Sequence, residues 1–104
     1  MNHLDSFCSY VLEQLSAMPD IHCRRMFGGY GLYQADRFFG ILYQGRLYFR
    51  TDTNTRQMYM QRGMDYFSPN ARQSLKRYYA VPVEVIEDQD VLKAWAVQAI
   101  HAHE

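Results

Sequence analysis

Apolar residues near the N-terminus recur three and four positions apart, which is the spacing of one face of a helix. This spacing predicts an amphipathic helix from about residue 3 to residue 18. Asn2 and Asp5 are typical N-terminal capping residues, and Pro19 would end the helix. The apolar face of this helix comprises Leu4, Phe7, Cys8, Val11, Leu15 and Met18.

The pattern changes between Cys23 and Thr51 to short runs of aromatic and branched residues, which favour strands. Turns are expected at Ala35-Asp36 and at Gln44-Gly45. This region is therefore predicted to form three consecutive antiparallel strands.

The next segment returns to helical and then to extended patterns. Asp52 or Thr53 can cap a second helix, and Gly63 marks its C-terminal end. Two short extended segments follow, near residues 65–68 and 73–80.

Pro82 opens an irregular or one-turn helical link, and Asp88 or Asp90 can cap a final helix. The apolar face of that helix carries Leu92, Trp95, Ala96 and Ala99. The predicted order is a helix, three strands, a helix, two strands and a helix. With 104 residues, of which 48% are hydrophobic, the chain is expected to form one α+β domain over residues 1–104.

No run of apolar residues is long enough for a membrane span, and the N-terminal stretch MNHLDSFCSY lacks the features of a signal peptide. A cytoplasmic location is expected. Cys8 and Cys23 fit no CxxC spacing and are expected to stay reduced.

The net charge of zero hides a partition along the chain. Residues 22–50 carry five Arg against one Asp, and residues 51–81 carry five bases against two acids. Residues 1–21 carry three acids and no Lys or Arg, and residues 82–104 carry five acids against one Lys. Two interpretations remain open: the basic middle guides a charged partner, or the acidic ends fold back and neutralise it.

The stretch FGGYG places Gly28, Gly29 and Gly31 between aromatic residues. A phosphate-binding loop needs a Lys followed by Ser or Thr and then a helix, whereas strand residues follow here. Glycine inside a strand marks a bulge or a close approach of other groups. We therefore expect these glycines to bend the first long strand or to let other groups pack flat on it.

Basic and aromatic residues of the middle region could form a nucleic-acid surface. The stretch RFFGILYQ matches about half of the RRM octapeptide, but the consecutive strands disagree with RRM topology. The other interpretation is that the aromatic residues belong to the core and the arginines are solvated. The candidate surface residues are Arg24, Arg46, Arg50, Lys76 and Arg77, with Tyr30, Tyr48, Tyr78 and Tyr79 beside them.

Residues with catalytic or metal-binding chemistry are few. His22 lies next to Cys23, and His101 and His103 are two apart, so on a helix they diverge. Cys8 lies on an apolar stripe, which favours a core position over a nucleophile. No catalytic residue, metal or cofactor is expected, and the chain is not expected to be an enzyme.

Four stretches of the chain, taken together, resemble the TfoX N-terminal domain family. They are RMFGGYGLY, RFFGILYQGRLYFRTD, GMDYFSP and YYAVPVEVIEDQDVLKAWAVQA. The resemblance covers about residues 7–100. The family motif, taken as structural, maps onto Met26, Phe27, Gly28, Gly29, Gly31, Leu32, Tyr33, Leu47, Tyr48, Gly63, Phe67, Tyr79, Pro82 and Trp95.

The resemblance implies an α+β domain with a curved antiparallel sheet packed by helices, similar to the secretion-chaperone-like fold. It also implies a link to the TfoX/Sxy regulators of bacterial natural competence, which act as coactivators with the cAMP receptor protein. The C-terminal helical domain of those regulators is not expected within residues 1–104. The first hairpin turn, usually Asp-Gly in the family, is here Ala35-Asp36-Arg37.

The function implied by the resemblance is a non-enzymatic regulatory module that binds a protein, such as a transcription factor of the cAMP receptor protein type. The alternative is a nucleic-acid-binding domain that uses the basic, aromatic sheet region. The sequence leaves the oligomeric state open, and a homodimer is compatible with it.

Overall fold

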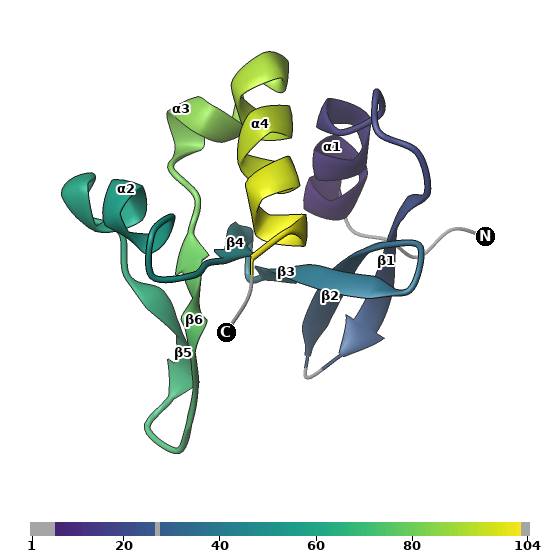
Figure 1. Ribbon diagram of the computed structural model, residues 1–104. Helices are drawn as coiled ribbons and strands as arrows, with labels where there is room; N and C mark the ends of the chain where they lie inside the picture. The colour runs from purple at the N-terminus through teal and green to yellow at the C-terminus, as the bar shows by residue number, and fades with distance from the viewer. Residues whose placement is uncertain (1–5, 27, 103–104) are drawn as a thin grey trace.

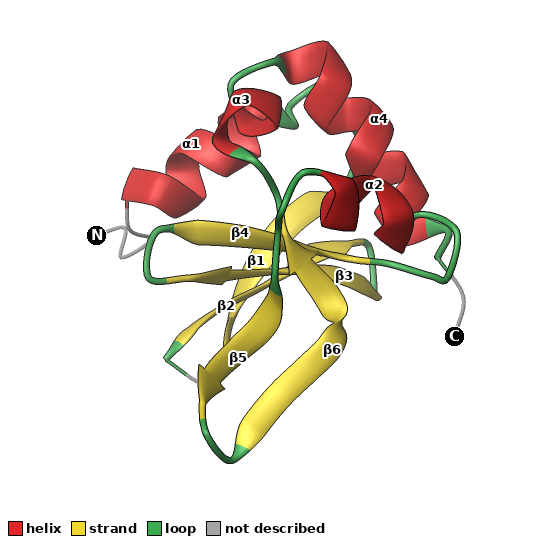
Figure 2. Cartoon of the chain, turned by 90° about the vertical axis from the view of Figure 1, so that its left-hand side faces the viewer, coloured by secondary structure: helices red, strands yellow, loops and turns green. Residues whose placement is uncertain are grey.

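A computed structural model of the protein describes residues 6–26 and 28–102. Six strands form one antiparallel sheet in the order β1-β2-β3-β4-β6-β5, and the helices lie together on one side of it (Figures 1 and 2). The elements are α1 (Ser6–Gln14), β1 (Ile21–Met26), β2 (Gly29–Gln34), β3 (Arg37–Tyr43), β4 (Arg46–Arg50), α2 (Arg56–Gln61), β5 (Tyr66–Asn70), β6 (Gln73–Ala80), α3 (Val83–Ile86) and α4 (Gln89–Ile100).

The α+β class and the order of helix, strand group, helix, strand pair and helix confirm the predicted fold. The one-turn α3 occupies the link that was expected after Pro82. Within the described residues, no helix has the length and apolar character needed to cross a lipid bilayer.

The first strand group contains four strands rather than the predicted three. β1 pairs with β2 up to Met26 and Gly29, so the two strands form a hairpin. Gly28 has a φ of 77°, a left-handed conformation that suits a tight hairpin. The turn was missed because aromatic residues surround it and no polar pair marks it.

Asp88 and Gly63 lie at helix ends as predicted. By contrast, α2 begins after Thr55, whose side chain makes no cap hydrogen bond, and Asp52 caps the turn before it. The Asp52 carboxylate accepts hydrogen bonds from the backbone N–H groups of Asn54 and Thr55, at 3.0 and 2.9 Å. These bonds to the ionised form lower the pKa of Asp52. Asp88 accepts from the first turn of α4 in the same way, and Gly63, with a φ of 74°, follows the end of α2.

The first helix is shorter than predicted, with its regular part ending at Gln14. Leu15 and Met18 still lie in the core, because single helical turns continue after α1. The predicted caps Asn2 and Asp5 lie outside the described residues.

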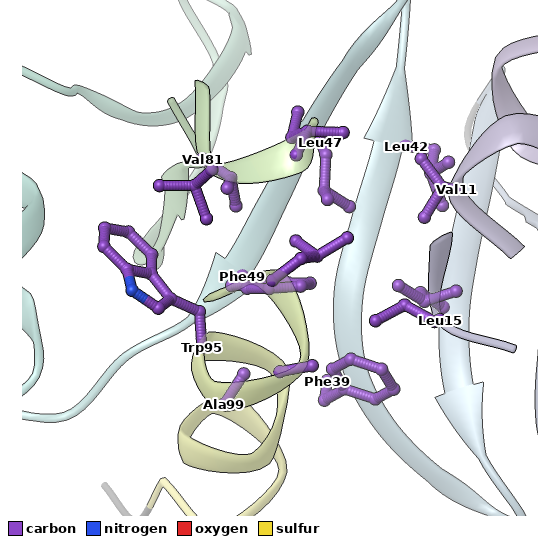
Figure 3. Packing of buried hydrophobic residues seen from close by; sticks show 14 of the residues in the cluster. Val11, Leu15, Phe39, Leu42, Leu47, Phe49, Val81, Trp95 and Ala99 are labelled. Carbon is purple, nitrogen blue, oxygen red and sulfur yellow. The ribbon is translucent and has the colours of Figure 1, made fainter. Parts of the chain in front are cut away.

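The main core fills the space between the helices and the sheet, as Figure 3 shows. Val11 and Leu15 approach the sheet from the side of α1, and Trp95 approaches from α4. The sheet contributes a second group, which consists of Leu32, Phe39, Leu42, Leu47 and Phe49. The predicted apolar face of the last helix, Leu92, Trp95, Ala96 and Ala99, is buried as expected.

Candidate interaction surface on the open face of the sheet

The side of the sheet opposite the helices, which we call the open face, carries a second packed layer. This aromatic layer consists of Tyr33, Phe38, Tyr43, Tyr48, Phe67 and Tyr78, with Ile41 beneath it. No described helix covers it, and the β1–β2 and β5–β6 hairpins bend to this side (Figures 1 and 2). The layer therefore lines the concave side of a curved sheet.

An irregularity in β3 directs residues to this layer. Leu32 pairs with Gly40 while the next residue, Tyr33, pairs with Phe38, so Phe39 is an extra residue on β3. Phe39 packs in the core on the helix side. Phe38 before the bulge and Ile41 after it both pack in the layer on the open face.

Ring contacts join distant strands of the sheet. Phe67 of β5 meets Tyr43 of β3 and Tyr48 of β4 edge-on, with ring centroids 5.3 and 5.0 Å apart. Phe38 contacts Tyr33 and Tyr78, each with a centroid distance of 5.3 Å. Because β5 and β3 are not neighbours in the sheet, the Phe67 contacts stabilise its curvature.

Gly29 and Gly31 lie beneath these side chains. A Cβ atom on Gly29 would collide with the Leu42 carbonyl oxygen and lie 3.1 Å from the Tyr43 ring. A Cβ on Gly31 would lie 2.5 Å from the Met26 sulfur and 3.2 Å from the Phe38 ring. The predicted close packing over these two glycines is confirmed.

Cations lie along the open face. The Arg24 guanidinium lies 4.8 Å from the centroid of the Tyr33 ring. On β4, Arg46 and Arg50 alternate with buried Leu47 and Phe49, so they share the face of Tyr48, as the alternation predicted.

The remaining candidate cations lie on β6. Arg50, Lys76 and Arg77 line a hollow of about 390 Å³ together with Tyr78 and two further residues of β6. The Lys76 amine also lies 5.9 Å from the centroid of the Tyr66 ring. The five candidate cations thus extend from β1 across β4 to β6.

Electrostatics couple the cations to the aromatic layer. Burial raises the pKa of Tyr78, and Arg50 and Arg77 oppose that rise. Burial also raises the pKa of Tyr48, and Arg46 opposes it. The guanidinium groups therefore lie close enough to the phenol groups to favour their ionised forms.

The sequence assigned some aromatic residues to the wrong face. Tyr30 and Tyr79 pack against the main core on the helix side, so they do not belong to the open face. Tyr33, Phe38, Tyr43 and Phe67 were missed as surface candidates, because their faces depend on a hairpin turn and on strand irregularities that alternation does not reveal. The signal in the sequence that could have found them is the high aromatic content of the strands that carry them.

The acidic C-terminal region lies on the opposite side of the molecule. Glu84, Glu87, Asp88 and Asp90 belong to α3 and the start of α4, in the helix layer (Figure 1). Arg62 of α2 pairs with Glu84 at 3.7 Å. Within residues 6–26 and 28–102, none of the five candidate cations forms a salt bridge with an acid. Among the described residues, these acids therefore pair with Arg62 of the basic middle but not with the five candidate cations.

Residues considered for metal binding or catalysis lie apart. His22 stacks on Tyr33 on the open face, whereas Cys23 packs against the main core. Cys8 is fully buried in that core. His103 lies outside the described residues, and among the described ones no three His, Cys, Asp or Glu side chains gather as a metal site would require.

The family motif divides between the two faces. Leu32, Leu47 and Trp95 lie in the main core, and Tyr79 packs against it. Gly29, Gly31, Tyr33, Tyr48 and Phe67 belong to the open face, with Met26 beside Gly31. Pro82 is buried at the start of α3, and Phe27 lies outside the described residues.

A curved antiparallel sheet with helices on its convex side and a basic, aromatic concave side defines the class of this α+β domain. The family model of the TfoX N-terminal domain matches residues 13–103, and the chain belongs to that family. A search of curated proteins found no match.

Proposed function

We propose that this TfoX-like module is a non-enzymatic regulatory domain that binds a protein partner through the open face of its sheet. The observation that carries the proposal is the separation of charge between the two sides of the molecule. Arg24, Arg46 and Arg50 lie on or beside the aromatic layer, whereas the acids of α3 and α4 lie in the helix layer. A one-signed face attracts and orients a partner of opposite charge.

The packing of the aromatic layer favours a protein partner over nucleic acid. Proteins that bind single strands present exposed rings on which bases stack. Here Phe67 and Tyr78 are 2% and 8% exposed, and the other four rings of the layer are half-buried. Each of the six rings also contacts another ring of the layer. The arginines could still contact phosphates, so nucleic acid remains the second candidate.

The partner is expected to present acidic side chains to this face. The resemblance to TfoX/Sxy regulators makes a transcription factor of the cAMP receptor protein type the first partner to test. A cytoplasmic place of action is part of the proposal.

The experiment is affinity capture from nuclease-treated lysate of the source organism, with purified parent protein as bait. The parent should retain a protein, and Arg46→Glu/Arg50→Glu should reduce its recovery by about tenfold or more, because like charges then face the partner. The control variant Arg25→Glu/Lys93→Glu makes the same net charge change at exposed positions that lie outside the aromatic layer. Equal losses in both variants would contradict the proposal.

A salt titration separates the two candidate functions. Binding of duplex and single-stranded DNA by the parent is measured by fluorescence anisotropy at several salt concentrations. We expect only weak binding, with a dissociation constant on the order of 10⁻⁴ to 10⁻⁶ M at physiological salt. Sub-micromolar binding that disappears in Arg46→Glu/Arg50→Glu would promote the nucleic-acid function instead.

A further inference from the structure

The sheet has a step where β4 ends before β6 does. β4 pairs with β6 only through residues 48–50, which lie opposite residues 78–80. The Thr51 N–H and hydroxyl then both donate to the Arg77 carbonyl oxygen at 2.7 Å, and the chain turns toward α2. On this side of β6, Gln73–Lys76 have no partner strand among the described residues.

This free edge of β6 is exposed and lies beside a hollow. Residues 71–77 are all exposed, and β5 pairs with β6 on the other edge, at Leu75 and Gln73. The hollow of about 390 Å³ lies along Ser74–Tyr78 and is bounded by Arg50. A polypeptide in extended conformation could continue the line of β4 along this edge.

Charge determines which strand could occupy the edge. Arg50, Lys76 and Arg77 all line the hollow, while Leu75 and Tyr78 supply apolar surface. A second copy of the chain, pairing through the same edge, would bring Lys76 and Arg77 close to their own counterparts, and such like-charge contacts are destabilising. A strand with acidic side chains would instead gain favourable contacts.

The other edges of the sheet are less suited to a partner strand. β5 is an outer strand, but Pro69 within it has no N–H group to donate. β1 is the other outer strand, and Arg24 and Arg25 lie on it. The Arg24 guanidinium lies over the Tyr33 ring.

We propose that the edge of β6 from Gln73 to Lys76 binds an acidic, extended segment of a protein partner as an added β-strand. A segment of about four to six residues spans this edge. Backbone hydrogen bonds to β6 hold the segment, and Arg50, Lys76 and Arg77 select its acidic side chains. This inference rests on the proposed function and specifies how the partner is recognised.

The probe is an eight-residue fluorescent peptide of alternating Glu and Val with blocked ends, and its binding is measured by anisotropy. The parent should bind it, and Lys76→Glu/Arg77→Glu should weaken binding by about tenfold or more. Arg25→Glu/Lys93→Glu is the matched control, because it makes the same net charge change at exposed positions outside the hollow, and it should change the affinity by less than about twofold. A peptide of alternating Lys and Val should not bind.

Two further peptides test for backbone pairing. One carries N-methyl groups on its Val residues and the other on its Glu residues. In an added strand, alternate N–H groups point to β6, so one methylated peptide should lose about tenfold in affinity and the other should retain it. Equal affinities of the two methylated peptides, whether retained or lost, would overturn the proposal and indicate attraction by charge alone.

Absence of binding by the unmodified acidic peptide would also overturn the inference. The proposed function is judged separately, by the capture experiment. A parent protein that captures a partner but does not bind the peptide would reject the edge site alone. Failure of both experiments would reject the proposed function as well.

Discussion

The two faces of the sheet are both packed with large side chains, but different groups cover them. On the helix side, Phe39 and Phe49 are fully buried beneath α1 and α4. On the open side, rings such as Phe38 and Tyr48 are covered only partly, by other rings of the same sheet. The difference indicates that the helix side stabilises the fold, and it is the reason why we propose the open side as the contact surface.

The largest expected effect contrasts two neighbours on β3. Phe39→Ala removes a fully buried ring from the main core and should lower the free energy of unfolding by about 3–5 kcal/mol. Phe38→Ala, on the open side, should cost about 1–2 kcal/mol, because its ring is only partly buried. Urea denaturation measures both. Equal losses would mean that the open side is as much a core as the helix side.

The second largest effect is expected from substitutions of the glycines beneath the aromatic layer. Gly29→Val and Gly31→Val should each cost about 1–3 kcal/mol and lower the melting temperature. Gly29→Val should be the more severe, since it meets the Leu42 backbone, whereas Gly31→Val meets the flexible end of Met26.

A second substitution serves as the control for this difference. Adding Met26→Ala to Gly31→Val removes the nearest obstacle and should recover part of the lost stability. Thermal unfolding followed by circular dichroism gives all the melting temperatures. If the Gly29 and Gly31 variants melt like the parent, close packing over these glycines is wrong.

The stability contributed by each face should respond differently to alkaline pH, because each side contains a buried tyrosine. Tyr59 on α2 and Tyr78 on β6 both have a pKa raised above the ordinary value of 10.0 by burial, so the stability linked to them is complete below pH 10 and falls as the pH rises further. Arg50 and Arg77 oppose the rise at Tyr78, but no such cations oppose it at Tyr59.

The measurement is the free energy of unfolding between pH 8 and pH 11.5 for the parent, Tyr59→Phe and Tyr78→Phe. Tyr59→Phe should reduce the alkaline loss more than Tyr78→Phe does. A larger reduction in Tyr78→Phe would contradict the view that the arginines stabilise charge on the open face.

The sequence predicted regular features of both faces but not the irregular ones. Alternation alone placed Arg46 and Arg50 on one face, and Asp88 was recognisable as a cap from its position before an apolar period. The sides of Phe38 and Phe39 could not be predicted, because the extra residue Phe39 shifts the alternation of β3 by one position. The side of the sheet on which Lys76 lies could not be predicted either, because the register of β5 on β6 shifts near this residue.

The central claim is that the open face binds the partner. The most direct test maps the surface of this protein that contacts the captured partner. Amide and side-chain NMR shifts of the labelled protein are recorded with and without the partner. The account predicts that the largest changes occur on β4 and β6, at Tyr48, Arg50 and Tyr78, with little change along α3 and α4. Changes confined to the helix layer, with those three residues unaffected, would contradict it.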